Sequence, residues 1–377
     1  MAERKKKPVS KSPIKKKVVK KVAKKGVKRA ASKITGRRKP TAISLKKPKA
    51  NPIIEPIVSD WEAKATFNPT AVTHGGEVHI IYRAIGNDDM SRLGYAHSKN
   101  GMKVDERHPN AAYVHEFNRE PKAGVKKVSY LSGGGWGGGA EDPRLTLLGS
   151  EVYLLYTAFN GWDSVRIALT RITLDDFLNK NFGGWEKPVF ISPPGEIHKN
   201  WALFPDKIGG KYAILHSISP EIMIDYFDDL DELDGETYIK SVHQGSLHWQ
   251  RRDKGVRGVG PSPLKTDFGW LVLYHATEEA DPGRYKLWAM LLDADNPERV
   301  IARSSKPILE PDEDYENDGY KWGVVYSCGA VIKEGNLIVY YGGADKVSCV
   351  ASADLNAFLS ELLKSGGRLS SRKKIKV

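Results

Sequence analysis

Apolar and polar positions alternate along five pairs of short runs, and a glycine-containing turn separates the two runs of each pair. The five segments are FNPTAVTHGGEVHIIYRA, EDPRLTLLGSEVYLLYTA, LFPDKIGGKYAILHS, GPSPLKTDFGWLVLYHA and CGAVIKEGNLIVYYGGAD. Alternation on both sides of a tight turn predicts β-hairpins. Equivalent Tyr or His residues near the ends of the second runs are 74, 60, 58 and 67 residues apart: Tyr82, Tyr156, His216, Tyr274 and Tyr341.

Further strand-like runs follow each hairpin, so each repeat is long enough for a small sheet. They read RLGYAHSKNG, VRIALTRITL, IMIDYF, YKLWAMLLD and VSCVASA. Helical spacing is clear in LNAFLSELLKSGG at 355–367, which ends at glycines. The pattern predicts an all-β fold: a five-bladed β-propeller with a short C-terminal helix, in which the inner strands border a central channel.

Charge is unevenly distributed along the chain. Residues 1–50 hold 21 Lys or Arg and one acidic residue, so removing their +20 from the chain's +13 leaves −7 on residues 51–377. Such a composition buries too little apolar surface to fold. We therefore expect a disordered Lys-rich tail at 1–50, a propeller domain at 51–365 and a short basic tail at 366–377. Two interpretations of the N-terminal tail stay open: an arm that contacts a polyanion through counterion release, or a solvated tail without a specific partner.

Several classes of protein are disfavoured by what the sequence lacks. No run of 18 or more apolar residues is present, so no membrane span is expected. Two cysteines, Cys328 and Cys349, and no secretory signal suggest a reducing compartment, which we take to be the cytoplasm. The histidines lack zinc-site spacing, so no metal is expected. The helix and the tails could support a homo-oligomer.

Equivalent strand ends in a propeller meet in a ring around the channel. First-strand starts are expected to supply Asn68, Asp142, Asp206 and Ser262, and second-strand ends Arg83, Thr157, Ser217, His275 and Gly342. Polar groups that converge in a concave site indicate ligand binding. Six aromatic residues accompany them and favour a carbohydrate, which has apolar ring faces and hydroxyl edges: Trp136, Trp162, Trp201, Trp270, Tyr285 and Trp322.

The most distinctive motif is Glu141-Asp142-Pro143-Arg144. A proline disfavours helical conformation in the residue before it, so Asp142 is expected to be extended. Arg144 is expected to point to the same side of the strand and to orient the Asp142 carboxylate. Asp-Pro alone is a common turn dipeptide, so the motif gains weight only from its neighbours.

Together these motifs resemble glycoside hydrolase family 130. The resemblance is carried by GGGAEDPRLT, FNPTAV…IIYRA, LFPDKIGGKYAILH, GWLVLYHA, YKLWAMLLD, PILEPDEDYENDGY and GAVIKEGNLIVYYGGAD, and it spans roughly residues 55–363. The family contains mannoside phosphorylases and some mannosidases on a five-bladed propeller. The resemblance implies inverting phosphorolysis of a mannose-containing oligosaccharide by inorganic phosphate. The product is mannose 1-phosphate, the reaction is reversible, and no cofactor takes part.

The resemblance also assigns residues. Asp142 is implied to be the sole catalytic acid, which protonates the glycosidic oxygen by relay through a sugar hydroxyl. The substrate-binding set is implied to be Asn68, Arg83, Glu141, Arg144 and Asp345. The phosphate-binding set is implied to be Lys199, Arg257, His275 and Tyr285. One position departs from the pattern, because Ser217 stands where phosphorylases usually have an arginine, and Arg166 and Arg171 are candidate replacements.

That departure leaves two alternatives open. A hydrolase would need a carboxylate to activate water, and Glu221, Asp225 and Glu278 lie just beyond predicted strand ends. A non-catalytic glycan-binding propeller is the other alternative, since one fold supports many functions. A pure binder would not need the EDPR motif together with Asp345.

Overall fold

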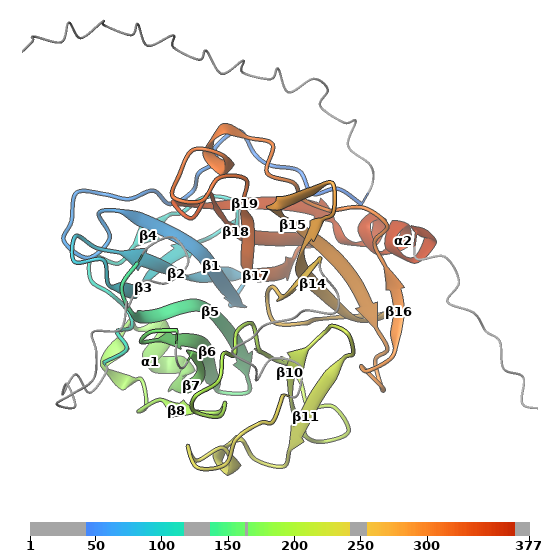
Figure 1. The fold of residues 1–377 in the computed structure, drawn as a ribbon, viewed down its shortest axis with the longest axis horizontal. Helices are drawn as coiled ribbons and strands as arrows, with labels where there is room; N and C mark the ends of the chain where they lie inside the picture. Colours follow the sequence, from blue (N-terminus) through green and yellow to red (C-terminus); the bar gives the residue numbers. More distant parts are fainter. Residues whose placement is uncertain (1–42, 117–135, 163–164, 242–254, 366–377) are drawn as a thin grey trace, which may run out of the picture. The chain divides into compact units, whose positions relative to one another are not determined.

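Antiparallel β-sheets make up most of the folded part of the chain, and helices are few (Figure 1). The computed structural model describes residues 43–116, 136–162, 165–241 and 255–365. The predicted basic tails lie outside these ranges, except for residues 43–50. No helix within the ranges is long and apolar enough to cross a membrane. The prediction of a mainly β fold is confirmed.

Five successive groups of antiparallel strands can be followed along the described residues. The first two groups are β1 (Ala65–His74), β2 (Glu77–Ile85), β3 (Ser91–Ser98) and β4 (Glu106–Arg107), then β5 (Gly139–Leu148), β6 (Glu151–Phe159), β7 (Val165–Thr173) and β8 (Val189–Phe190). The third is β9 (Ala202–Leu203), β10 (Tyr212–Ser217) and β11 (Met223–Phe227). The last two are β12 (Val256–Val259), β13 (Leu264–Thr266), β14 (Gly269–Glu278), β15 (Asp281–Leu292) and β16 (Val300–Arg303), then β17 (Val325–Lys333), β18 (Asn336–Gly343) and β19 (Val347–Asp354).

Helical segments are short and follow strands. They are α1 (Leu174–Leu178), α2 (Leu355–Ser365) and 3₁₀ turns at Phe182–Gly184, Leu230–Glu232 and Asp314–Glu316. The predicted C-terminal helix corresponds to α2, which buries Phe358, Leu359 and Leu362. A single parallel bridge, Ser91 to Gly139, joins the first two groups into one sheet.

All five predicted hairpins are present, as β1–β2, β5–β6, β9–β10, β13–β14 and β17–β18. The additional strand-like runs form β3, β7, β11, β15 and β19. Glycines with positive φ angles explain the position of the turn in the first hairpin. Between β1 and β2, Gly75 and Gly76 have φ of 58° and 79°, and two successive positive φ angles suit the right-handed twist of a tight hairpin.

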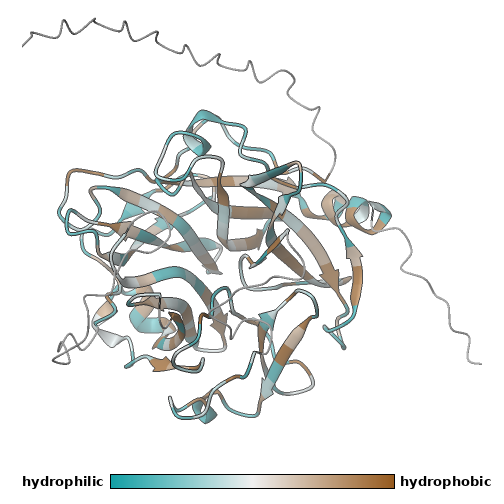
Figure 2. Ribbon diagram, in the orientation of Figure 1, coloured by the Kyte–Doolittle hydropathy of each residue, from teal (hydrophilic) through white to brown (hydrophobic). Residues whose placement is uncertain are grey.

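Among the described residues, five of the six clusters of buried apolar side chains each join two neighbouring groups of strands. Side chains alternate along a strand, so β14 places Leu271 and Leu273 in one cluster and Val272 and Tyr274 in another. Strands buried on both faces contain long apolar runs, and Figure 2 shows brown segments along the strands and teal in many of the turns. A further cluster contains residues of β1, β2, β17 and β18. Packing therefore runs from each group to the next and returns from the last to the first.

First strands of the groups carry irregularities at equivalent places. Registers shift between Phe67 and Thr70 in β1, between Glu141 and Arg144 in β5, and at Ser327 in β17. Each β-bulge adds a residue and redirects the strand end. β1 packs against both β5 and β17, so these bulges are brought together in the middle of the folded part (Figure 1).

Residues 43–54 are part of the folded body, which corrects the tail boundary expected at residue 50. Ile43 and Leu45 are buried in the cluster that contains β14–β19. Backbone hydrogen bonds join Lys46 N to Ser352 O at 2.8 Å and Ile53 N to Ser348 O at 2.8 Å. Two apolar side chains and edge-strand pairing thus offset the local Lys-rich composition. We call residues 43–54 the N-terminal strap.

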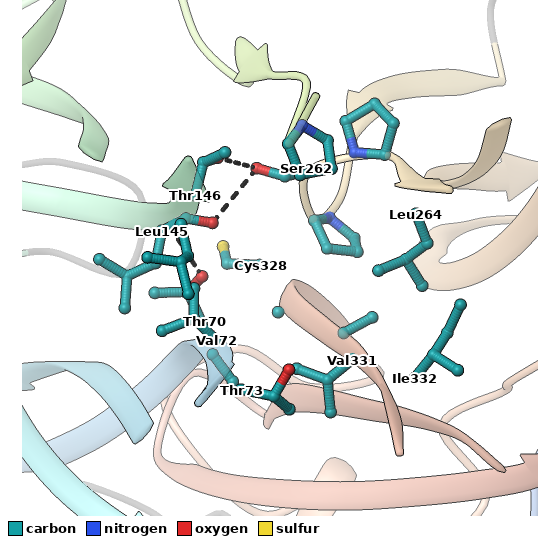
Figure 3. A pocket seen from close by; sticks show the side chains of 17 residues that line it. Thr70, Val72, Thr73, Leu145, Thr146, Ser262, Leu264, Cys328, Val331 and Ile332 are labelled. Carbon is teal, nitrogen blue, oxygen red and sulfur yellow. Dashed lines mark hydrogen bonds between the residues drawn. The ribbon is translucent and has the colours of Figure 1, made fainter. Parts of the chain in front are cut away.

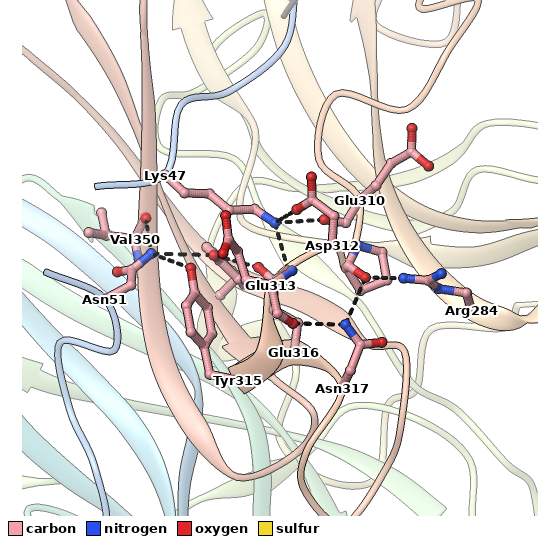
Figure 4. Close-up of polar contacts among 12 residues, drawn as sticks. Lys47, Asn51, Arg284, Glu310, Asp312, Glu313, Tyr315, Glu316, Asn317 and Val350 are labelled. Carbon is pink, nitrogen blue, oxygen red and sulfur yellow. Dashed lines mark hydrogen bonds and ion pairs between the residues drawn. The ribbon is translucent and has the colours of Figure 1, made fainter. Parts of the chain in front are cut away.

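Lys47 of the strap is bound by the loop that precedes β17 (Figure 4). Its ammonium donates to Glu310 O at 2.7 Å, to Glu316 Oε2 at 2.6 Å and to Asp312. The Glu316 side chain is fully buried, and its other oxygen accepts a 2.8 Å bond from the Tyr341 hydroxyl. A buried carboxylate needs such partners, so the strap fixes the loop.

Candidate active site

Asp142 lies at the bulge near the start of β5. Its φ is 50°, which corrects the expectation that Pro143 holds it extended. The extra residue of the bulge is accommodated in the left-handed region, which Asp and Asn tolerate better than most residues. Only 6% of Asp142 is exposed. The fold therefore presents this carboxylate in a buried, preset position.

Two side chains from the first group of strands hold the Asp142 carboxylate. Asn68 Nδ2 donates to Asp142 Oδ1 at 2.8 Å, and a guanidinium nitrogen of Arg83 lies 3.4 Å from the same oxygen. Arg83 also pairs with Glu141 Oε1 at 2.9 Å, and Lys199 Nζ lies 3.2 Å from Glu141 Oε2. Cations and carboxylates thus alternate across three groups of strands.

The pKa values of two carboxyl groups of this site, Asp142 and Asp345, are shifted in opposite directions. Burial raises the pKa of Asp142, but the charges of Arg83, Lys199 and Arg144 outweigh burial and hold that pKa below its usual value. Asp345, which follows β18, is 8% exposed. Burial raises the pKa of Asp345 from 3.8 to about 6 against the opposing charges of Lys321 and Arg83. In the free protein Asp142 is ionised, whereas Asp345 exchanges a proton near neutral pH.

Arg144 has a different role from the one expected. Its guanidinium donates to Gly260 O at 2.6 Å, Val259 O at 2.9 Å and Asn200 Oδ1 at 3.0 Å. It reaches Asp142 through the backbone carbonyl, at 2.9 Å, and not through the carboxylate. Arg144 therefore ties the bulge of β5 to the third and fourth groups of strands, while Arg83 and Asn68 orient the carboxylate.

Asn200 joins the same network, and the sequence reasoning missed it. Its Nδ2 donates to Arg257 O at 2.9 Å, and its Oδ1 also accepts a 2.6 Å bond from Tyr326. Like Asp142, Asn200 has a positive φ, 65°. The predicted ring took Asp206 as the first-strand start of the third repeat. Aligning KNWALF on the bulge instead would have found Asn200.

His275 lies beside this network as a neutral ring. It stacks on Tyr326 with ring centroids 4.0 Å apart and an interplanar angle of 6°. Its Nε2 accepts a 2.9 Å bond from Ser327 N, so the neutral ring carries its proton on Nδ1. Burial, followed by the charge of Arg144, lowers the pKa of His275 to about 3. His275 can therefore act as a neutral donor but not as a cation.

Tyr285 lies beside two cations. The Arg257 guanidinium is 5.6 Å from the Tyr285 ring centroid, and Lys321 Nζ is 4.1 Å from it. The Tyr285 ring centroid is also 6.4 Å from that of Tyr326. The ten residues singled out from the sequence are thus brought into one connected group, to which the structure adds Asn200, Tyr326 and Lys321.

Asp206 and Ser262 lie outside this group, contrary to the predicted ring. Asp206 pairs with Lys265, and 48% of its side chain is exposed. Ser262 Oγ is 2.9 Å from Thr146 Oγ1, where both line a cavity of about 270 Å³ with Cys328 (Figure 3). Within the described ranges, no group of three His, Cys, Asp or Glu side chains is arranged to hold a metal ion.

Comparison with known proteins identifies the family of the chain. A family model of glycoside hydrolase family 130, described as β-1,4-mannooligosaccharide phosphorylase, matches residues 37–364. The chain belongs to this family. It is 36% identical over 328 residues to a 1,2-β-oligomannan phosphorylase of Thermoanaerobacter sp. strain X514, covering 83% of this chain and 98% of that protein. It is 34% identical over 308 residues to a β-1,2-mannobiose phosphorylase of the same organism, covering 78% and 92%.

Solved structures show the same fold. The β-1,2-mannobiose phosphorylase of Listeria innocua, in complex with β-1,2-mannobiose, superposes with a TM-score of 0.62 at 24% identity. The match covers 84% of this chain and 99% of that one. At that identity the likeness concerns the fold alone.

In this family 130 protein the aromatic residues expected to cluster divide into two sets. Trp201 and Trp270 are 1% and 3% exposed and belong to the apolar clusters between strand groups. Trp162 and Trp322 are 43% and 56% exposed. Trp162 lies over Lys199 at 5.4 Å, and Trp322 follows Lys321 in the chain. Trp162 therefore lies beside Lys199, whereas the Trp322 ring lies against Arg284, whose guanidinium is 5.1 Å from its centroid.

Arg166 and Arg171, the candidate replacements for the missing arginine, and two of the candidate hydrolytic bases contact other residues. Arg166 donates to Ser192 O at 2.9 Å, and Arg171 pairs with Glu186 and Asp231, each at 3.0 Å. Two of the carboxylates considered as hydrolytic bases also have cationic or imidazole partners: Glu278 with Lys286 and Asp225 with His216. None of these contacts involves Asp142.

Proposed function

We propose that this protein cleaves β-mannosides by inverting phosphorolysis, releasing α-mannose 1-phosphate and a shortened glycan. The observation that carries the proposal is the buried Asp142 carboxylate, which Asn68 and Arg83 orient and whose pKa the charges of Arg83, Lys199 and Arg144 lower. The neighbouring buried carboxylate of Glu141 is held in ion pairs with Arg83 and Lys199. A hydrolase of the inverting type needs a second carboxylate to activate water. Phosphate is itself a nucleophile and needs cations to hold it.

Asp142 is proposed to supply the proton of the leaving group. In the free protein its carboxylate is ionised because of the cations around it. A bound phosphate dianion opposes those cations and so favours the protonated acid. As a phosphate oxygen bonds to the anomeric carbon, the glycosidic bond breaks and Asp142 gives its proton to the departing oxygen through a sugar hydroxyl. The proton lost by phosphate balances the proton gained by the released hydroxyl.

The remaining residues are proposed to divide into two subsites. Asn68, Arg83, Glu141, Arg144 and Asp345 would hold the mannosyl unit around Asp142, directly or by positioning its neighbours. Lys199, Arg257, His275 and Tyr285 would hold phosphate. The two proposed subsites adjoin, since Glu141 pairs with Lys199 and Asn200 is hydrogen-bonded to Arg257 O and Tyr326.

Two relatives with 34% and 36% identity act on β-1,2 linkages by name. We therefore propose a β-1,2-linked mannose disaccharide or oligosaccharide as the substrate, with inorganic phosphate as co-substrate and no cofactor. The matching family model is that of a β-1,4-mannooligosaccharide phosphorylase, so β-1,4-mannobiose is the comparison substrate.

We further propose that the five strand groups are the blades of a five-bladed propeller. The cyclic sharing of apolar clusters supports this, since one cluster links the first and last groups. Two free, buried thiols, Cys328 and Cys349, support a reducing location such as the cytoplasm. Polyanion contact by the basic tail and self-association stay predictions.

The test uses the full chain and Asp142→Asn with β-1,2- and β-1,4-mannobiose, each with and without phosphate. Mannose 1-phosphate and free mannose are both measured. Phosphate-dependent mannose 1-phosphate from the wild type, absent from the variant, is the expected result. Free mannose without phosphate would make the protein a hydrolase. Binding of mannobiose without any product would leave a glycan-binding protein.

A further inference from the structure

Charge balance in the site leaves room for one more cation. The site contains four cations, Arg83, Arg144, Lys199 and Arg257, and three carboxyl groups, Glu141, Asp142 and Asp345. Four cations and three carboxylates leave a single positive charge, whereas phosphate near neutral pH carries up to two negative charges. Lys199 is moreover already paired with Glu141, 3.2 Å away.

Lys321 lies where such a cation is needed. Its Nζ is 4.1 Å from the centroid of the Tyr285 ring. Its charge is the largest of those that lower the pKa of Asp345, and it also lowers the pKa of His275. Lys321 is therefore close both to two residues proposed to hold phosphate and to one proposed to hold the mannosyl unit.

The loop that carries Lys321 is fixed on both sides. Lys321 N donates to Ala344 O at 3.0 Å, next to Asp345, and Tyr285 N donates to Gly323 O at 2.9 Å. Gly319 packs so closely that an added Cβ would lie 2.4 Å from Ala344 O. The strap reaches the same loop, because Glu316, the partner of Lys47, accepts at its carbonyl from Gly323 N at 3.1 Å.

Among the described residues, the Lys321 ammonium forms no ion pair and lies over a neutral phenol ring. A cation that lies on an aromatic face and is not directly paired with a carboxylate is available to an incoming anion. We propose that Lys321 is a phosphate-binding residue that contacts the co-substrate phosphate beside Tyr285, and the phosphate of mannose 1-phosphate in the reverse reaction. This rests on the proposed phosphorolysis.

The experiment compares Lys321→Met and Lys321→Arg with the wild type. A charged hydrogen bond is worth enough that its loss should raise the KM for phosphate about 10-fold to 100-fold. The KM for mannobiose should change less than about twofold, and Lys321→Arg should recover most of the phosphate affinity. Lys265→Met is the matched control, because Lys265 also lies over an aromatic ring, Trp270, at 5.8 Å, but pairs with Asp206 outside the site.

Calorimetric titration with inorganic phosphate alone separates this inference from the proposed function. Weaker phosphate binding by Lys321→Met than by Lys265→Met supports the role of Lys321 even if no mannoside is cleaved. Equal phosphate affinity in the two variants overturns it, as does a rise in the mannobiose KM as large as that in the phosphate KM. If Lys321→Met does not fold, Lys321→Gln is titrated in its place, with the same two outcomes.

Discussion

Asn68 donates a 2.8 Å hydrogen bond to the carboxylate of Asp142, 74 residues later in the chain. Both residues lie at bulges of first strands, and both have left-handed backbones, with φ of 48° and 50°. The same local distortion in neighbouring strand groups therefore aims one side chain at the other. The proposed acid is oriented by the fold before any substrate binds.

Asp142→Asn should abolish phosphorolysis while leaving the fold intact. Asn is tolerated in the left-handed region, and this chain already has it at the equivalent positions 68 and 200. Loss of a general acid costs about 10²- to 10⁴-fold in rate, so we expect kcat to fall by about 10³-fold. The thermal midpoint should change little. A variant that kept a tenth of the wild-type kcat would remove Asp142 from the proposed role.

Asn200→Gly should destabilise the protein by about 1–3 kcal/mol. The change leaves Arg257 O without a donor and deprives Arg144 and Tyr326 of an acceptor, and unsatisfied buried groups cost about that much. Asn200→Ala is the matched variant. It loses the same bonds but must also adopt a φ of 65°, which should add about 1–2 kcal/mol. Urea unfolding of both variants measures the difference, and equal stabilities would argue against strain.

Asp345→Asn should become more stabilising relative to wild type as pH rises. Burial raises the pKa of Asp345 from 3.8 to about 6, so the folded state binds this proton more tightly than the unfolded state. The contribution of the protonated Asp345 carboxyl to folding stability is fully present below about pH 4 and is lost as pH rises through about 6. From pH 4 to pH 8, the difference in unfolding free energy between variant and wild type should grow by up to about 3 kcal/mol. The experiment varies position 345 alone, because the pKa of Asp345 also depends on four neighbouring charges: Arg83, Lys321, Asp142 and Glu141. A pH-independent difference would contradict the expectation.

Lys47→Met should destabilise the protein by about 3 kcal/mol, because it leaves the buried Glu316 carboxylate without its cation. The double variant Lys47→Met/Glu316→Gln should regain part of the loss, since no buried charge then stands alone. Lys211→Met is the control: Lys211 pairs with Asp228, and the two side chains are 47% and 79% exposed, and such exposed pairs contribute less than about 1 kcal/mol. Chemical unfolding of the three variants decides the comparison.

Hairpins, their order and the C-terminal helix could be predicted from the sequence because strand alternation and turn glycines are local signals. The bulges could not, since a left-handed Asp142 or Asn200 is selected by neighbouring strands rather than by its own sequence. The predicted ring consequently included Asp206 and Ser262, which lie outside the site. Lys321 was missed for a similar reason, because only the packing of its loop against Tyr285 and Ala344 brings it to the site.

The N-terminal strap has a consequence for the order in which the molecule can assemble. Leu45 and Lys46 bond to Ile308 and Ser352, more than 260 residues further on. During synthesis these early residues leave the ribosome long before their partners exist. The strap is therefore synthesised first but is among the last segments to dock. Until the final sheet has left the ribosome, the strap has no partner strand, and the nascent chain cannot complete its fold.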